Sequence, residues 1–411
     1  MRIQIMHETP MKQLGVWLAA VASWVALPGL LLAAGTQAEE GFRHFYNLEY
    51  DQAIAAFRQE IAERPQDPAG YNHLAQAVLY QGLYRSGQME NSLVTGDDFL
   101  TALIQQPKLV LTVSEDAEFK QAVKAAFEAE RGLLERNPND AAGLYALGVT
   151  YGLRANYRFL VEKAWLGTLR DSNAARRFHN QVAEMEPGNT DAKMLEGLHS
   201  YVVASLPAGL RMLGAVVGIR GDKERGLQIL EDVATHGSQN SIDARIVLAT
   251  LYRHEKRSGP AMQVLDKLVA EFSRNYLFRL ARVYTLAEMR DRKAAMGALR
   301  EVAELARTGA PGYDGVRLAK LQYAQGWIYL RTGDLDQAME SLEQVAETAD
   351  PEDAIMRLRA SVRLGQVYDL RGQRQQAREA YQRVVASAPK SRCGQESQRF
   401  LLKPYQGSDG G

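Results

Sequence analysis

Residues 365–389, GQVYDLRGQRQQAREAYQRVVASAP, decide the fold of this chain. Small, aromatic and helix-ending residues follow the first glycine at offsets of 3, 12, 16 and 24 residues: Gly365, Tyr368, Ala377, Tyr381 and Pro389. Gly365 and Ala377 allow two helices to approach closely, and Tyr381 lies one turn beyond Ala377 on the same helix face. The proline ends the second helix. The stretch therefore predicts an antiparallel helical hairpin.

The same spacing recurs in three other parts of the chain. Its copies are Gly326, Tyr329, Ala338 and Leu342; Ala249, Tyr252, Ala261 and Leu265; and Gly41, Ala53, Phe57 and Pro65. A hairpin that is apolar on two faces cannot stand alone and has to stack on its neighbours. Such a stack accounts for the length of 411 residues, because a single core stops growing at about 250–300 residues.

The pattern resembles the tetratricopeptide repeat (TPR) family, and the chain looks like an exported, bacterial-type member. The resemblance covers about residues 41–75 and 130–390. It implies an all-α fold, a right-handed α-solenoid of TPR-like helical hairpins with non-repeat insertions and a concave groove lined by the first helices. The tryptophan that the family carries at its fourth position is replaced here by Tyr71, Leu144 and Leu277. Residues 220–227, RGDKERGL, also resemble a segment of the inclusion-body-clearance family of repeat proteins, though only weakly.

Six segments follow from the repeat and its interruptions. We predict a signal peptide or N-terminal membrane anchor (1–38), N-terminal TPR-like hairpins (39–81), an insertion (82–118), degenerate TPR-like helices with an apolar insertion at 205–220 (119–240), C-terminal TPR-like repeats (241–390), and a short capping helix with a flexible tail (391–411). The number of repeats stays open.

The N-terminus predicts export. Leu14–Leu32 carries no charge and follows the basic residues Arg2 and Lys12. Small residues before Glu39 favour cleavage of a signal peptide after Ala38. An uncleaved anchor is the alternative, because the apolar run approaches the roughly 20 residues that span a bilayer. In both cases we expect the body in the periplasm or cell envelope. Whether the chain starts at Met1 or at Met11 stays open.

Composition excludes several classes of protein. The 49 basic and 49 acidic residues give a formal net charge of zero, which argues against a nucleic-acid-binding protein with a basic face. The single cysteine, Cys393, excludes intramolecular disulfides and cysteine-based zinc sites. The sequence has no Gly-rich phosphate loop, dinucleotide fingerprint or nucleophile elbow. We therefore expect a protein that is not an enzyme and that uses no cofactor or metal.

Candidate binding residues come from two patterns. Groove positions of the first helices, as the resemblance assigns them, are occupied by Asn72, Gln76, Tyr145, Lys320, Tyr323, Trp327 and Arg359, with Arg363 at the next position. The basic and aromatic segment 153–178 adds Arg154, Tyr157 and Trp165. Aromatic and basic residues in alternation are suited to an acidic peptide, a glycan or a lipid headgroup. The alternative for this segment is a helix whose aromatic residues pack and whose charges are solvated.

The sequence leads to three functional hypotheses. The first is an exported, non-enzymatic TPR scaffold or adaptor that binds a protein or peptide partner on its concave face, in envelope assembly or maintenance. The second is a periplasmic receptor or enzyme with a ligand pocket between insertion 82–118 and segment 153–178. The third is a membrane-surface protein that attaches through 205–220, for which a helix buried against the solenoid is the structural alternative. The identity of the partner and the oligomeric state stay open.

Overall fold

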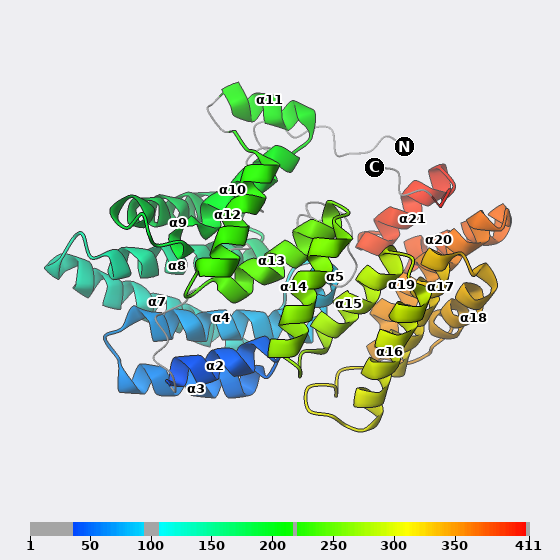
Figure 1. Cartoon of the computed structure of the whole chain (residues 1–411), viewed down its shortest axis with the longest axis horizontal. Helices are drawn as coiled ribbons and strands as arrows, with labels where there is room; N and C mark the ends of the chain where they lie inside the picture. The colour runs from blue at the N-terminus through cyan, green and yellow to red at the C-terminus, as the bar shows by residue number, and fades with distance from the viewer. Residues whose placement is uncertain (1–35, 94–106, 217–219, 408–411) are drawn as a thin grey trace. The chain divides into compact units, whose positions relative to one another are not determined.

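The computed structural model describes residues 36–93, 107–216 and 220–407. Within these ranges every regular element is a helix, and the chain folds as an all-α helical repeat solenoid (Figure 1). Most of the predicted signal segment, the centre of the predicted insertion with Asp97 and Asp98, and the end of the predicted tail lie outside the described residues.

The described residues fall into two compact units. Unit 1 ends at Leu251 and unit 2 begins at Tyr252, except that Leu93 is grouped with unit 2. Unit 1 contains α2 (Gln37–Tyr46), α3 (Tyr50–Glu63), α4 (Pro68–Arg85), α5 (Gln88–Leu93), α7 (Val113–Arg136), α8 (Ala141–Tyr157), the π-helix η1 (Arg158–Glu162), α9 (Trp165–Met185), the 3-10 turn η2 (Asp191–Lys193), α10 (Met194–Ser205), α11 (Ala208–Val216), α12 (Lys223–His236) and most of α13 (Ser241–His254). Consecutive helices from α2 to α4 and from α7 to α9 pack against each other, as do α10 and α12.

Unit 2 contains the end of α13, α14 (Ser258–Glu271), α15 (Tyr276–Glu288), α16 (Arg292–Arg307), α17 (Leu318–Thr332), α18 (Leu335–Ala346), the 3-10 turn η3 (Pro351–Asp353), α19 (Ala354–Leu370), α20 (Arg374–Ser387) and α21 (Arg392–Leu402). Each helix from α14 to α21 packs against the next one. In addition, α15, α17, α19 and α21 form a row in which each helix contacts the following member. We call α15, α17, α19 and α21 the inner row, since they are the first helices of their hairpins or, for α21, continue that row.

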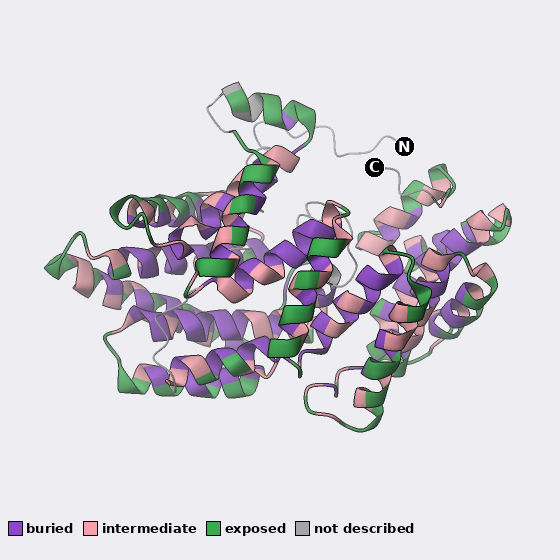
Figure 2. Ribbon diagram, in the orientation of Figure 1, coloured by how far each residue is buried: buried purple, intermediate pink, exposed green. Residues whose placement is uncertain are grey.

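The glycines of the repeat pattern lie where the second helix comes closest to the first. A Cβ atom added at Gly365 would lie 2.4 Å from a ring carbon of Tyr381, and one at Gly326 would lie 2.7 Å from Leu342. At Gly41 the same atom would lie 2.3 Å from Phe57. Because real Cβ atoms essentially never approach so closely, a larger residue at these positions would force the facing side chain or helix to move. Buried faces accordingly point toward neighbouring helices along the stack (Figure 2).

Both ends of the predicted insertion, 82–118, are helical in the structure. Helix α4 continues to Arg85 and α7 begins at Val113, so helical residues occupy both ends of 82–118. Between residue 107 and α7 the chain has no regular structure, and Leu109 is fully buried there. The Leu109 N–H donates a hydrogen bond to the carbonyl oxygen of Leu160 in η1 at 2.9 Å. The described end of the insertion therefore lies against the start of segment 153–178.

Segment 205–220 forms a helix, α11, between α10 and α12 of unit 1. Its Leu210 is buried, whereas Met212 exposes 72% of its surface. Figure 1 shows α11 extending beyond the ends of α10 and α12. After it, Gly221 approaches the backbone of α10, because an added Cβ atom would lie 2.3 Å from the Ser200 carbonyl oxygen. Residues 217–219 lie outside the described residues. Membrane attachment through this segment stays a prediction.

Ala38, after which the sequence favours cleavage, lies in the first turn of α2 and is 3% exposed. Thr36 caps this helix by accepting a hydrogen bond from the Glu39 N–H. Cleavage after Ala38 would remove both the cap and a buried side chain. Cleavage at this bond stays a prediction.

Candidate protein-binding site

The candidate residues differ strongly in how much surface they offer to a partner. Seven of them expose less than a tenth of their surface: Asn72, Gln76, Tyr145, Tyr157, Tyr323, Arg359 and Arg363. Four others keep intermediate exposure: Arg154, Trp165, Lys320 and Trp327. The sequence pattern therefore does not separate packed residues from accessible ones.

Trp327 on α17 is the centre of a group of aromatic and basic side chains in the inner row of unit 2. Its ring lies 6.4 Å from that of Tyr284 on α15, measured between centroids. The Arg363 guanidinium from α19 lies 4.9 Å from the Trp327 ring centroid, and the Arg331 guanidinium lies 5.7 Å from it. We call Tyr284, Trp327, Arg331 and Arg363 the Trp327 cluster. Cation–π contacts of this kind hold the indole in a fixed orientation.

The indole Nε1 of Trp327 is buried and donates to no acceptor among the described residues. A buried donor left without an acceptor costs about 1–3 kcal/mol. The Trp327 side chain as a whole keeps intermediate exposure, so its accessible part is ring surface away from Nε1.

Gln366 on α19 belongs beside this cluster and was missed by the sequence prediction. It is 2% exposed, and its Oε1 accepts no hydrogen bond from the described residues. Its Nε2 lies 3.5 Å from a Glu396 oxygen that also accepts a 2.6 Å hydrogen bond from Arg363. The sequence signal was present, because Gln366 directly follows Gly365 and so occupies a groove position of its repeat.

Lys320 and Tyr323 occupy the preceding turns of α17. The Lys320 Nζ lies 3.2 Å from the Tyr276 hydroxyl oxygen, 3.1 Å from the Gly315 carbonyl oxygen and 4.8 Å from the Tyr276 ring centroid. Tyr323 is 2% exposed, and its ring lies 6.5 Å from that of Tyr284. Both residues thus tie α17 to its surroundings, and Lys320 retains accessible surface.

In unit 1 three candidate residues lie in the packed interior. Asn72 on α4 donates to the Ala146 carbonyl oxygen on α8 at 3.2 Å and accepts from the Thr150 hydroxyl at 2.8 Å. The Tyr145 hydroxyl accepts from the Asn240 amide at 2.9 Å. Gln76 is 1% exposed, and neither of its side-chain polar atoms has a partner among the described residues. Asn72 and Tyr145 therefore connect elements of the fold.

The candidate residues of segment 153–178 also include both packed and partly accessible side chains. Tyr157 stacks on Phe119 with ring centroids 4.7 Å apart, and Trp165 meets the edge of Phe159 at 5.2 Å. Arg154 is ion-paired with Asp171. The aromatic residues of this segment pack, as its structural alternative expects, while its arginines remain partly accessible.

Glu130 on α7 is fully buried beside Asn72, and its Oε1 lies within hydrogen-bond distance of the Thr150 hydroxyl oxygen. Burial raises the pKa of its carboxyl group to about 7, against the lowering effect of the hydrogen bonds from Thr150 and Asn72. Asp243, which accepts from the Tyr46 hydroxyl at 2.6 Å, also has its pKa raised to about 7 by burial.

We expect Glu130→Gln to stabilise the protein at pH 8 by about 1 kcal/mol and to have much less effect near pH 4. An unfolded glutamate has a pKa of about 4.3, so between that value and about 7 the folded state holds a proton that the unfolded state has lost. Stability therefore falls as pH rises through this window, and glutamine removes the fall due to Glu130. Urea denaturation at both pH values measures the difference. An equal effect at the two values would contradict the assignment.

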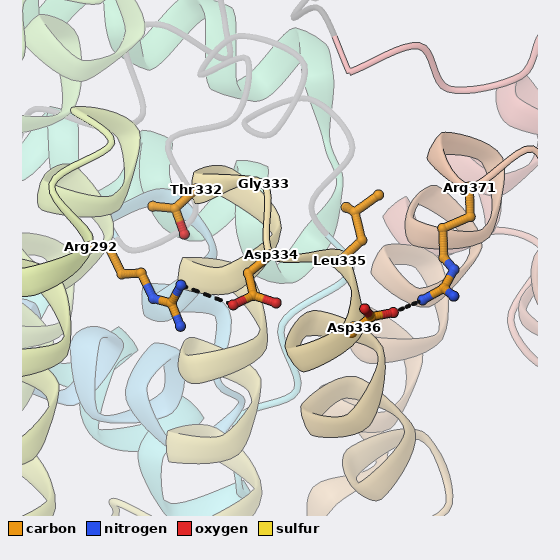
Figure 3. A pocket seen from close by; sticks show the side chains of 7 residues that line it. All are labelled: Arg292, Thr332, Gly333, Asp334, Leu335, Asp336 and Arg371. Atoms are coloured by element: carbon orange, nitrogen blue, oxygen red, sulfur yellow. Dashed lines mark hydrogen bonds and ion pairs between the residues drawn. The ribbon is translucent and has the colours of Figure 1, made fainter.

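A surface cavity of about 590 Å³ lies at the turn between α17 and α18 (Figure 3). Its lining residues are Arg292, Thr332, Gly333, Asp334, Leu335, Asp336 and Arg371. Arg292 is ion-paired with Asp334 at 2.9 Å, and Arg371 is ion-paired with Asp336. Because each basic lining group is neutralised by an acidic one, the cavity gives no reason to assign a charged ligand or a reaction to it.

Two further properties concern the part of the chain that the structure describes. There, no three His, Cys, Asp or Glu side chains are grouped so that they could hold a metal ion. None of the helices there has the length and apolar composition to cross a membrane.

Burial raises the pKa of the Cys393 thiol, which disfavours the nucleophilic thiolate.

The inner row of unit 2 carries the repeat that a comparison with protein families recognises. The family model described as tetratricopeptide repeat matches residues 323–392, from Tyr323 in α17 to the first residue of α21. Residues 323–392 are thus similar to the tetratricopeptide repeat family. The matched TPR region contains the Gly326–Leu342 and Gly365–Tyr381 contacts and most of the Trp327 cluster. The predicted all-α repeat fold is confirmed by the helices of the structure, and the predicted TPR resemblance is confirmed for residues 323–392.

Solved structures with a similar fold include three helical proteins at low identity. The APC/C hetero-tetramer Cut9–Hcn1 matches with a TM-score of 0.46 and 13% identity, over 87% of this chain and 54% of that chain. Human IFIT1, in a dimer with m7Gppp-AAAA, matches at 0.41 and 11%, over 97% and 89%. Yeast Tom70 matches at 0.37 and 12%, over 89% and 94%. This chain thus spans about half of the Cut9–Hcn1 chain, and these likenesses carry no functional argument. A comparison with curated proteins finds no match.

Proposed function

We propose that this TPR protein is a scaffold that binds a segment of a protein partner at the Trp327 cluster of unit 2. The observation that carries the proposal is the accessible surface of Trp327, an aromatic ring in the inner row with two guanidinium groups against it. Tryptophan and arginine are the residues most enriched among those that dominate binding energy at protein interfaces. TPR folds are typical of proteins that bind other proteins.

The geometry also indicates what the partner segment offers. An apolar side chain of the partner covers the accessible part of the Trp327 ring. Arg331 and Arg363 lie on the ring and hold it in place. Because these groups stand on packed helices, the site loses little conformational entropy on binding.

The finer parts of the proposal rest on the sequence. The charge-free run Leu14–Leu32 supports export. The partner is then a protein of the periplasm or cell envelope, and the role is envelope assembly or maintenance. The proposed scaffold is not an enzyme.

A receptor function is favoured by one specific observation. The hydrogen bond from Leu109 to Leu160 brings the described end of insertion 82–118 against segment 153–178. This hypothesis stays a prediction, since residues 94–106 lie outside the described part.

Capture of a partner from an envelope fraction tests the scaffold proposal. The full chain without its predicted export segment serves as bait, and the captured protein is then bound in purified form. We expect direct binding by the purified pair and competition by a peptide from the partner. Failure of every captured protein to bind in purified form would remove the proposal.

A further inference from the structure

Three arginines of segment 153–178 converge on one carboxylate in unit 1. Arg154 donates to Asp171 through Nε at 2.7 Å and through Nη2 at 2.9 Å. Arg158 donates to the same carboxylate through Nη1, and the Arg170 Nε lies 3.8 Å from it. The Asp171 side chain is 1% exposed. This buried carboxylate therefore gathers three guanidinium groups, which we call the arginine triad.

The arginine triad has an excess of positive charge. Three guanidinium groups and one carboxylate give a local charge of 3 − 1 = +2, counting the ion pairs of Arg154, Arg158, Arg170 and Asp171. Within the described residues, Asp171 is the only carboxylate at ion-pair distance from any of the three arginines. The potential at this surface consequently favours an anion.

Two of the guanidinium groups are held in fixed positions. The Arg154 guanidinium lies 4.7 Å from the Phe127 ring centroid and 4.9 Å from that of Tyr151. The Arg158 stem lies on Gly167, where an added Cβ atom would be 3.0 Å from the Arg158 Cδ. The side chains of Arg154 and Arg158 nevertheless expose 29% and 21% of their surface. Their orientation is thus fixed before any ligand arrives, which lowers the entropic cost of binding.

Both arginines keep donors that Asp171 does not use. Arg154 engages Asp171 through Nε and Nη2, which leaves Nη1. Arg158 engages Asp171 and the Gly167 carbonyl oxygen through Nη1, which leaves Nε and Nη2. No protein acceptor for these remaining donors is found in the described ranges. The planar guanidinium fork matches the geometry of phosphate oxygens.

We propose that the arginine triad binds a phosphate group with two negative charges, as free phosphate or as a phosphate monoester. A dianion neutralises the charge of +2, whereas a carboxylate monoanion would leave half of it. Asp171 acts as a positioning residue that holds Arg154 and Arg158 in place. The site lies in unit 1 and does not depend on the proposed function of the Trp327 cluster.

Calorimetric titration of the full chain without its predicted export segment tests this site. The soluble probes are inorganic phosphate and glycerol phosphate, and the membrane probe is phosphatidylcholine vesicles with phosphatidic acid. We expect saturable binding at pH 8 that weakens as the pH falls through the second pKa of the probe, which is about 6 for a phosphate monoester and about one unit higher for inorganic phosphate. Binding of the soluble probes alone assigns the site to free phosphates, and binding of the vesicles alone assigns it to a lipid headgroup. Binding of none of them would overturn the proposal.

Variants separate the arginine triad from general basic charge. Arg158→Gln and Arg170→Gln are expected to weaken phosphate binding roughly tenfold or more, because each removes a charge-assisted contact. Arg170 is 73% exposed, so its variant keeps the test valid if Arg158→Gln unfolds. The matched control is Arg177→Gln, an exposed arginine of α9 that rests on the Phe178 ring. Equal losses in the control and in Arg170→Gln would contradict the site.

Discussion

Replacement of Gly365 by alanine is expected to destabilise the protein by about 1–3 kcal/mol. The added Cβ atom would lie 2.4 Å from a ring carbon of Tyr381. That ring has no room to retreat, because Tyr381 is fully buried and its hydroxyl donates to Asp369 at 3.1 Å. The helices α19 and α20 must therefore separate or the ring must leave its preferred rotamer. Urea denaturation followed by circular dichroism measures the loss.

Gly297→Ala provides the matched control for this substitution. Gly297 lies inside α16, and a Cβ atom added there meets nothing within 4 Å. Alanine at such a position is expected to stabilise the helix by about 0.5–1 kcal/mol. The two variants make the same chemical change, so opposite signs isolate the effect of close helix approach. If both stabilise the protein, the proposed reason for Gly365 is wrong.

Trp327→Ala is expected to weaken binding of the purified partner roughly thirtyfold, or about 2 kcal/mol. The substitution removes both the indole donor and the ring that Arg331 and Arg363 contact. Trp327→Phe keeps an aromatic ring without the N–H and should lie between the wild type and the alanine variant. Fluorescence anisotropy with a labelled partner peptide measures the three affinities.

Leu318→Ala is the control on the same helix. Leu318 is 68% exposed at the start of α17, so its loss removes apolar surface without disturbing packing. We expect its affinity to stay within a factor of about two of the wild type. If Trp327→Ala binds as well as the Leu318→Ala control, the Trp327 cluster does not hold the partner.

The hairpins were predictable because their spacing reflects direct contacts. Gly365 and Tyr381, separated by 16 residues in the sequence, touch across the helix pair. The same holds for Gly326 and Leu342. A small residue facing a large one at a fixed offset is a local property, since both belong to one hairpin. The sequence therefore carries the fold class without knowledge of distant neighbours.

The accessible part of the binding face was not predictable in this way. Position in the repeat selects a helix face, but exposure depends on how closely the next inner helix approaches. Tyr323 thus became buried and Trp327 stayed partly accessible, although both hold groove positions. The arginine triad depends on the π-helix η1 and on Lys163, which adopts a left-handed backbone conformation with φ of 56°. No spacing rule indicated that turn.

The most direct test of the account is site-specific photo-crosslinking in the cells that make the protein. A photo-reactive amino acid replaces Arg331, one turn from Trp327 on α17, and a control replaces the exposed Arg300 on α16. We predict that position 331 crosslinks to one envelope protein, that position 300 does not, and that Trp327→Ala removes the crosslink. Crosslinking of the same protein from both positions, or persistence after Trp327→Ala, would contradict binding at the Trp327 cluster.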